Sequence, residues 1–229
     1  MRLLTFPLAA AAICAPLLYA ADESKFTERL DDSAALLSEV MSTPDKSIPQ
    51  DLLNKAACIV IVPGLKKGAF VVGAKYGRGF AICRGTGGQG WGPPAAIAIE
   101  GGSFGLQIGV SSSDVIMLVM NERGMKRMMQ DKFTVGADAT AAAGPVGRNA
   151  TAQTDAMMTA EILSWSRARG AFVGASLDGA TMRSDVDQNE AMYGKRWTSR
   201  QILNSGATPP AAAAKLLDLL TKYSMRKTG

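Results

Sequence analysis

Between residues 57 and 121 the chain consists of short apolar runs separated by glycine, proline, serine and asparagine. The runs are ACIVIVP, GAFVVGAKYG, RGFAICR, AAIAIEGG, FGLQIGVS and SDVIMLVMN. Runs of this length, rich in valine, isoleucine and phenylalanine, predict β-strands. Their connections are too short to hold crossover helices, so neighbouring strands are expected to be antiparallel. The pattern predicts a glycine-rich antiparallel sheet system, either a sandwich or barrel-like.

Helical patterns flank this sheet on both sides. Residues 22–42 begin with acidic side chains and repeat apolar ones every three or four positions, which predicts an amphipathic helix. Residues 209–223 begin with prolines and repeat leucine on one side, which predicts a C-terminal helix. The predicted fold class is therefore α+β, a sheet system flanked by N- and C-terminal helices.

The chain beyond residue 121 mixes the two patterns. A helix is expected over 122–131, with Asn121 as its cap. Residues 133–147 form an extended segment of small side chains, and residues 160–185 predict two or three further strands joined by glycine turns.

The first twenty residues have a basic start, an apolar stretch and a small residue, Ala20, at a cleavage position. This pattern predicts a signal peptide and a periplasmic or secreted protein. Acylation of Cys14 in a lipoprotein is the alternative, but Ile13 is bulky where a small residue is expected. The predicted organisation is a signal peptide over 1–20, an amphipathic helix and linker over 21–49, and a single domain with a C-terminal helix over 50–229.

Cysteine and histidine usage limits the chemistry. Cys58 and Cys83, the cysteines beyond the predicted signal peptide, can form a disulfide in an oxidising compartment or be two buried small residues. The absence of histidine excludes Ser-His-Asp and Cys-His catalysis and imidazole zinc sites. We therefore expect no metal, no cofactor and no enzyme. A carboxylate-based hydrolase using Glu100 or Asp138 is the remaining enzymatic alternative.

Charge is distributed unevenly along the chain. Residues 22–51 carry a net charge of −5, whereas residues 52–99 contain six basic side chains and no acidic one. A basic segment in an exported protein favours an anionic partner such as a lipid headgroup or a polyanionic glycan over nucleic acid. A solvated basic face without a partner is the alternative.

The loop RGTGGQGWGPP spaces glycines 85, 87 and 90 as a dinucleotide-binding fingerprint does. That site needs a helix to begin at the glycine turn, within a parallel βαβ unit. Here Pro93 and Pro94 lead directly into another predicted strand. The loop is therefore predicted to connect two antiparallel strands, with Trp91 as its anchor.

The order of five segments resembles the SYLF domain family. They are GAFVVGAKYGRGFAICR, GWGPPAAIAIEGGSFGLQIG, GADATAAAGPVGR, SRARGAFVGASLDGA and NEAMYGK, within residues 50–206. SYLF domains are known as phospholipid-binding modules, and some fungal relatives bind and bundle actin. The resemblance implies a non-enzymatic, exported module that recognises anionic phospholipid. Animal members use a basic N-terminal helix to insert into membranes, but residues 22–42 carry a charge of −4 here, so this helix is not expected to insert.

The candidate headgroup ligands are basic side chains near predicted turns, because loops commonly carry binding residues. They are Lys66, Lys67, Lys75, Arg78, Arg84, Arg148, Arg167 and Arg169. For each of them a solvated turn residue is the alternative. The glycine-rich strands also suggest an alternative function, a structural protein that forms homo-oligomers through exposed strand edges.

Overall fold

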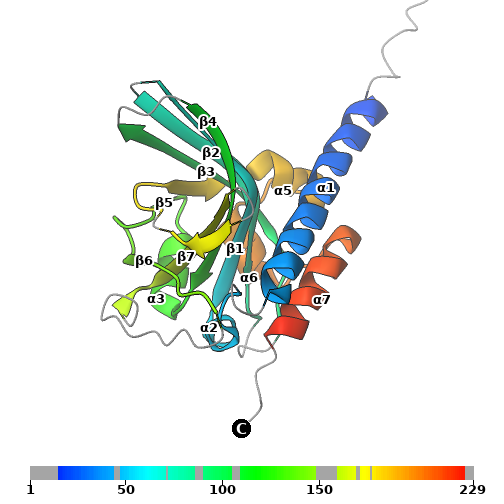
Figure 1. The fold of residues 1–229 in the computed structure, drawn as a ribbon. Coiled ribbons are helices and arrows are strands. Elements are labelled where there is room, and N and C mark those ends of the chain that lie inside the picture. The colour runs from blue at the N-terminus through cyan, green and yellow to red at the C-terminus, as the bar shows by residue number, and fades with distance from the viewer. Residues whose placement is uncertain are drawn as a thin grey trace, which may run out of the picture.

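The computed structural model describes residues 15–43, 47–70, 72–85, 90–104, 109–147, 159–168, 171–175 and 177–224. Within these residues nine strands form one sheet that curls into a half-barrel (Figure 1). Helices from both ends of the chain lie against one side of it. The predicted α+β class with flanking helices is confirmed.

Helices and strands are interspersed along the described chain. The helices are α1 (Ala15–Ser42), α2 (Gln50–Lys55), α3 (Glu122–Met128), α5 (Val186–Tyr193), α6 (Ser199–Ser205) and α7 (Ala214–Tyr223), with a 3-10 turn η1 (Ala211–Ala213) before α7. The strands are β1 (Cys58–Phe70), β2 (Val72–Cys83), β3 (Ala95–Phe104), β4 (Gly109–Val119), β5 (Lys132–Thr134), β6 (Ala141–Ala143), β7 (Ile162–Ala168), β8 (Ala171–Gly174) and β9 (Thr181–Ser184). The sheet order is β5-β9-β3-β2-β1-β4-β7-β6, and β8 pairs with β7.

Four long strands form the centre of the sheet. The six apolar runs between residues 57 and 121 fold into only four strands, which pair antiparallel in the spatial order β3-β2-β1-β4. The run GAFVVGAKYG, predicted as one strand, is divided between β1, which ends at Phe70, and β2, which begins at Val72. Pairing is not antiparallel throughout, because β6 runs parallel to β7. The sheet is therefore mixed.

A β-bulge interrupts β1 at Pro63 and Gly64, where the register with β4 shifts between Val62 and Leu65. Gly64 has a φ of 65°, which glycine adopts without strain, and its N–H donates to the carboxylate of Asp114 at 2.9 Å. Lys66 and Lys67 follow the bulge. The sequence predicted a turn at this point, but the strand continues because neighbours pair with it on both sides.

Both faces of the central strands are buried, which explains the continuous apolar run CIVIV. On the side of α1 and α7, Ile59, Ile61 and Phe80 pack in one core. On the side enclosed by the curl, Val60 and Val62 pack in a second core. Because successive side chains of β1 point to opposite faces of the sheet, this one strand contributes residues to both cores.

The C-terminal third differs most from the expectation. Asp178 and Gly179 form a turn, as predicted, but β8 and β9 do not form a hairpin: β8 pairs with β7, and β9 pairs with β3 and β5. The sequence did not predict α5 and α6. The carboxylate of Asp185 caps α5, and a capping box at Thr198 begins α6.

The N-terminal helix is longer than predicted. α1 begins at Ala15 among the described residues, so it includes Ala20, and it ends at Ser42 before Pro44. In the part of the chain that the structure describes, no helix combines the length and the apolar character needed to cross a bilayer.

Candidate functional site

One end of the central sheet extends beyond the rest of the molecule (Figure 1). Neighbouring strands stop short of it, because β9 pairs with β3 only over Ile97–Glu100 and β7 pairs with β4 only over Asp114–Val119. Beyond these limits β3, β2, β1 and β4 continue as four strands. We call this the projecting end: residues 66–70, 72–76, 101–104 and 109–113.

Three of the predicted headgroup ligands lie in the projecting end. Lys66 and Lys67 are exposed on β1, and Lys75 lies opposite Lys67 on β2. The sequence placed all three in turns, whereas the structure places them in paired strands. The projecting end contains no acidic residue, and among the described residues neither Lys66 nor Lys67 has a carboxylate partner. Positive charge is therefore concentrated in the projecting end, and Asp178, outside it, interacts with Lys75 alone of the three.

Lys75 is the most constrained of the three lysines. Its stem crosses the position where Gly101 lacks a side chain, since an added Cβ there would overlap the Lys75 Cε atom. The Lys75 Nζ donates to the backbone carbonyl of Asp178 at 3.3 Å. Burial, and then the positive charge of Lys67, lower the pKa of Lys75 from its usual value.

Arg78 lies just outside the projecting end, on the face of β2 that is turned toward α1. Its Nε donates to the hydroxyl of Tyr76 at 2.8 Å and lies 3.2 Å from the buried carboxylate of Asp185. The bond to Tyr76 is the main reason that the pKa of Arg78 is raised. Arg29 of α1 lies nearby and donates to Gln188 at 2.9 Å. Burial, and then the charge of Arg78, lower the pKa of Arg29. Arg78 is thus partly exposed but already paired.

Arg84, one of the predicted headgroup ligands, bonds to backbone carbonyls of the fold. Its guanidinium donates to the carbonyls of Leu53, Asn54, Ala56 and Ser224 at 3.1–3.3 Å, at the C-terminal ends of α2 and α7. The same guanidinium lies 4.4 Å from the ring centroid of Trp91. A cation at two helix C-termini is favourable, because carbonyl groups are left unpaired there.

Trp91 is placed as an anchor of its loop, as predicted. Its ring nitrogen donates to the hydroxyl of Ser224 at 2.8 Å, which ties the loop to the end of α7. Gly85 and Gly90 flank residues that lie outside the described part of the chain, and Trp91 forms an isolated β-bridge with Arg84. The segment after Pro94 is strand β3, so no helix follows the glycines and the dinucleotide site is excluded.

Arg167 is also committed to the fold. It forms ion pairs with Glu39 of α1 and, at 2.7 Å, with Asp114 of β4. Burial opposes the charged form, but bonds to the two carboxylates outweigh burial and raise the pKa of Arg167. Arg167 therefore holds the end of α1 to the sheet. Arg148 and Arg169 lie outside the described residues.

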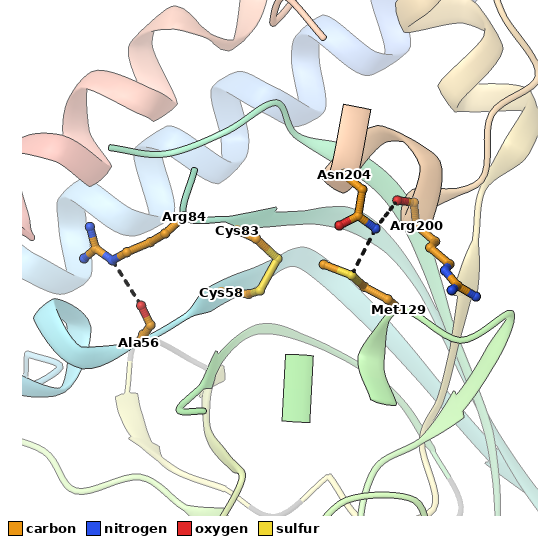
Figure 2. The surroundings of a disulfide bond; sticks show 7 residues. All are labelled: Ala56, Cys58, Cys83, Arg84, Met129, Arg200 and Asn204. Carbon is orange, nitrogen blue, oxygen red and sulfur yellow. Dashed lines mark hydrogen bonds between the residues drawn. A yellow bond between two sulfur atoms is a disulfide. The ribbon is translucent and has the colours of Figure 1, made fainter. Parts of the chain in front are cut away.

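Cys58 and Cys83 are joined by a disulfide at the opposite end of the hairpin from the lysines. The two residues are directly opposite each other in the β1–β2 register, and both are buried. Figure 2 shows this bond between Arg84, which is bonded to Ala56, and Asn204, which is bonded to the sulfur of Met129. A disulfide that closes a loop of this size stabilises by about 3 kcal/mol through the unfolded state. We call this region the disulfide end.

The carboxylates considered for hydrolysis are engaged in bonds that hold the fold. Glu100 of β3 is paired with Arg183 of β9, and Asp138 accepts the backbone N–H of Thr134 at 2.6 Å in a turn. Among the described residues no three cysteine or carboxylate side chains are arranged to hold a metal ion.

These features define an α+β half-barrel domain with a closed disulfide end and a basic projecting end. The model of the Ysc84 family, described as "Las17-binding protein actin regulator", matches residues 100–223. The chain belongs to this family, which is the one that the SYLF resemblance indicated.

Similar proteins come from animals and yeast. "SH3 domain-containing YSC84-like protein 1" is 31% identical over 183 residues in Xenopus laevis and 30% identical over 182 residues in Homo sapiens. "LAS seventeen-binding protein 3" of Saccharomyces cerevisiae is 30% identical over 179 residues. These matches cover 77–79% of this chain, but 53–54% of the two animal proteins and 39% of the yeast protein. The chain thus spans about half the length of the animal relatives that it matches.

Proposed function

We propose that this protein is an exported, non-enzymatic module that binds anionic phospholipid through the projecting end of its sheet. The observation that carries the proposal is the placement of Lys66, Lys67 and Lys75 on adjacent strands without an acidic residue in that end. Each lysine near an anionic membrane surface contributes about 1 kcal/mol, so three together give a useful and salt-sensitive attachment.

The projecting end also offers apolar contact beside the lysines. Val110 of β4 is 87% exposed, more than Tyr76 or Val173. Lysine stems lie along an interface while their ammonium groups remain in water, so the two residue types suit a headgroup boundary. The contact proposed is therefore peripheral and lies at the headgroup level.

The acidic helix α1 is not proposed as part of the contact. Its apolar residues, including Phe26, Leu30 and Leu37, are buried against the sheet. Its outward side carries Glu28 and Asp31, which an anionic bilayer repels. This packing supports the prediction that the helix does not insert.

The disulfide supports the exported location, because such bonds persist in oxidising compartments and are rare in the cytosol. Export follows from the signal pattern of the first twenty residues, with cleavage after Ala20 rather than acylation at Cys14. The mass of the chain recovered from the producing cell distinguishes the two.

Vesicle co-sedimentation tests the lipid proposal. The wild type is compared with a triple variant, Lys66→Ser, Lys67→Ser and Lys75→Ser, on phosphatidylglycerol-containing and pure phosphatidylcholine vesicles. A matched control removes three exposed lysines elsewhere, Lys55→Ser, Lys132→Ser and Lys222→Ser. We expect the triple variant to bind the anionic vesicles on the order of 100-fold more weakly, and the control to bind nearly as the wild type does.

Two outcomes contradict the proposal. One is an equal loss in both triple variants, which would show that only the net charge matters. The other is a wild type that fails to bind anionic vesicles even at low salt. Circular dichroism and thermal unfolding of all three proteins establish that the variants remain folded.

A further inference from the structure

Among the described residues, β4 has no outer neighbour in the projecting end. β4 pairs with β1 along its length, whereas its other side pairs with β7 only from Asp114 onward. Residues 109–113, with the sequence GVSSS, therefore have a partner strand on one side alone among the described residues. We call this stretch the free edge of β4.

The free edge of β4 lacks the features that usually prevent edge pairing. Natural edge strands carry lysine, proline or a bulge where they would otherwise bind another strand. Residues 101–113 contain no charged residue and no proline, and Val110 is almost fully exposed. The backbone groups along the free edge of β4 are thus available to a strand from another molecule.

We propose that the free edge of β4 pairs antiparallel with the same edge of a second copy of this chain. Antiparallel pairing of identical strands is twofold symmetric, so one patch completes both molecules and the assembly closes as a dimer. Full overlap of the five residues places the twofold axis at Ser111. Ser111 then lies opposite Ser111 of the second copy, and Val110 lies opposite Ser112.

The side chains of the free edge suit this register. Gly109 lies opposite Ser113 of the second copy, next to the end of β7, and has no side chain to clash there. Val110 gains a cross-strand neighbour that covers part of its exposed surface. The edge carries no charged side chain that would attract a charged peptide. A second copy of the chain is therefore the occupant that fits its composition best.

Electrostatics fixes the salt dependence of the dimer. Lys66 and Lys67 lie on β1, directly beside Ser112 and Ser111. In the dimer, equivalent lysines are separated by three strand spacings, about 14 Å, which exceeds the screening length of about 8 Å at physiological ionic strength. This repulsion is strongest at low ionic strength, where the screening length is longer. Raising the salt concentration weakens it and stabilises the dimer. Lipid binding through the same lysines has the opposite salt dependence.

Cysteine cross-linking tests the register. Directly opposed cysteines on antiparallel strands form a disulfide in this protein, as Cys58 and Cys83 do. We expect oxidised Ser111→Cys protein to form a covalent dimer. The matched control Ser112→Cys, equally exposed and one residue away, should not link to itself. A mixture of Val110→Cys and Ser112→Cys proteins should form the mixed dimer. Peptide mapping verifies that the Cys58–Cys83 bond is retained.

Sedimentation velocity provides the second measurement. A five-residue edge is a small contact, so we expect a reversible dimer whose fraction rises with protein concentration and with salt. Ser111→Lys, which places the usual guard of an edge strand at the twofold axis, should be monomeric and still bind anionic vesicles. A monomeric wild type under all conditions, or equal cross-linking of Ser111→Cys and Ser112→Cys, overturns the dimer whatever the vesicle experiment shows.

Discussion

The disulfide end and the projecting end belong to the same β1–β2 hairpin, but different side chains surround them. At the disulfide end, Cys58–Cys83, Arg84 and Trp91 connect two strands to the ends of α2 and α7. At the projecting end, small residues and lysines predominate, and among the described residues β3 and β4 each have a paired strand on one side only. One continuous hairpin therefore provides both a fixed base and a surface left available for binding.

Stability should depend most strongly on a glycine in the packed body of the β1–β2 hairpin. An alanine Cβ at Gly79, in the body of the sheet, would overlap the Ile61 carbonyl oxygen and lie 2.8 Å from the Val62 Cα. Backbone atoms do not move aside cheaply, so Gly79→Ala should reduce the free energy of unfolding by about 3 kcal/mol or more. Urea denaturation measures this loss.

Gly68→Ala is the matched control in the projecting end. It lies on the same hairpin, and an added Cβ there meets nothing within 4 Å. Its free energy of unfolding should stay within about 0.5 kcal/mol of the wild type. Equal losses at Gly79 and Gly68 would contradict the distinction between a packed base and an open end.

A smaller effect is expected from Arg84→Gln. The variant removes a charged donor from four backbone carbonyls and also the contact with Trp91. The free energy of unfolding should therefore fall by about 2 kcal/mol. Arg200→Gln, at an exposed position on α6, is the control and should change little. Vesicle binding of folded Arg84→Gln should match the wild type. A specific loss of lipid binding would return Arg84 to the headgroup site that the sequence suggested.

The strands and terminal helices could be predicted because their signals are local. Runs such as CIVIV are apolar on both faces, and the leucines of α7 repeat at helical spacing. The sequence between β1 and β2 carries no Asn-Gly or Asp-Gly pair, so the boundary between these two strands was predicted wrongly. Pro63-Gly64 resembles a turn, and only pairing with strands on both sides makes it a bulge.

The roles of the basic side chains could not be predicted in the same way, because their partners are distant in the chain. Arg84 bonds to a carbonyl 140 residues away, and Arg167 pairs with Asp114, 53 residues away. Positive charge in a glycine-rich segment indicates an anionic partner but does not show which cations the fold has already paired. Lys66 and Lys67 remain exposed, without a carboxylate partner among the described residues, whereas Lys75 is half-buried and bonded to the Asp178 carbonyl.

The smallest expected effect is the pH dependence caused by Lys75. Its pKa is lower in the folded protein than the usual 10.5, so the folded state binds this proton more weakly than the unfolded chain does. Its unfavourable contribution is therefore constant at neutral pH and is relieved as pH rises from the lowered value toward 10.5.

Lys75→Met keeps the stem over Gly101 and removes the titration. The difference in the free energy of unfolding, wild type minus variant, should rise with pH in that alkaline window. Because the charge of Lys67 is the second cause of the lowered pKa, Lys67→Met should reduce the rise, whereas Lys66→Met, on the other face of β1, should leave it unchanged. A difference that falls with pH would mean that Lys75 is stabilised by its bond to Asp178 more than it is destabilised by burial, and the lysine cluster would then be part of the fixed base.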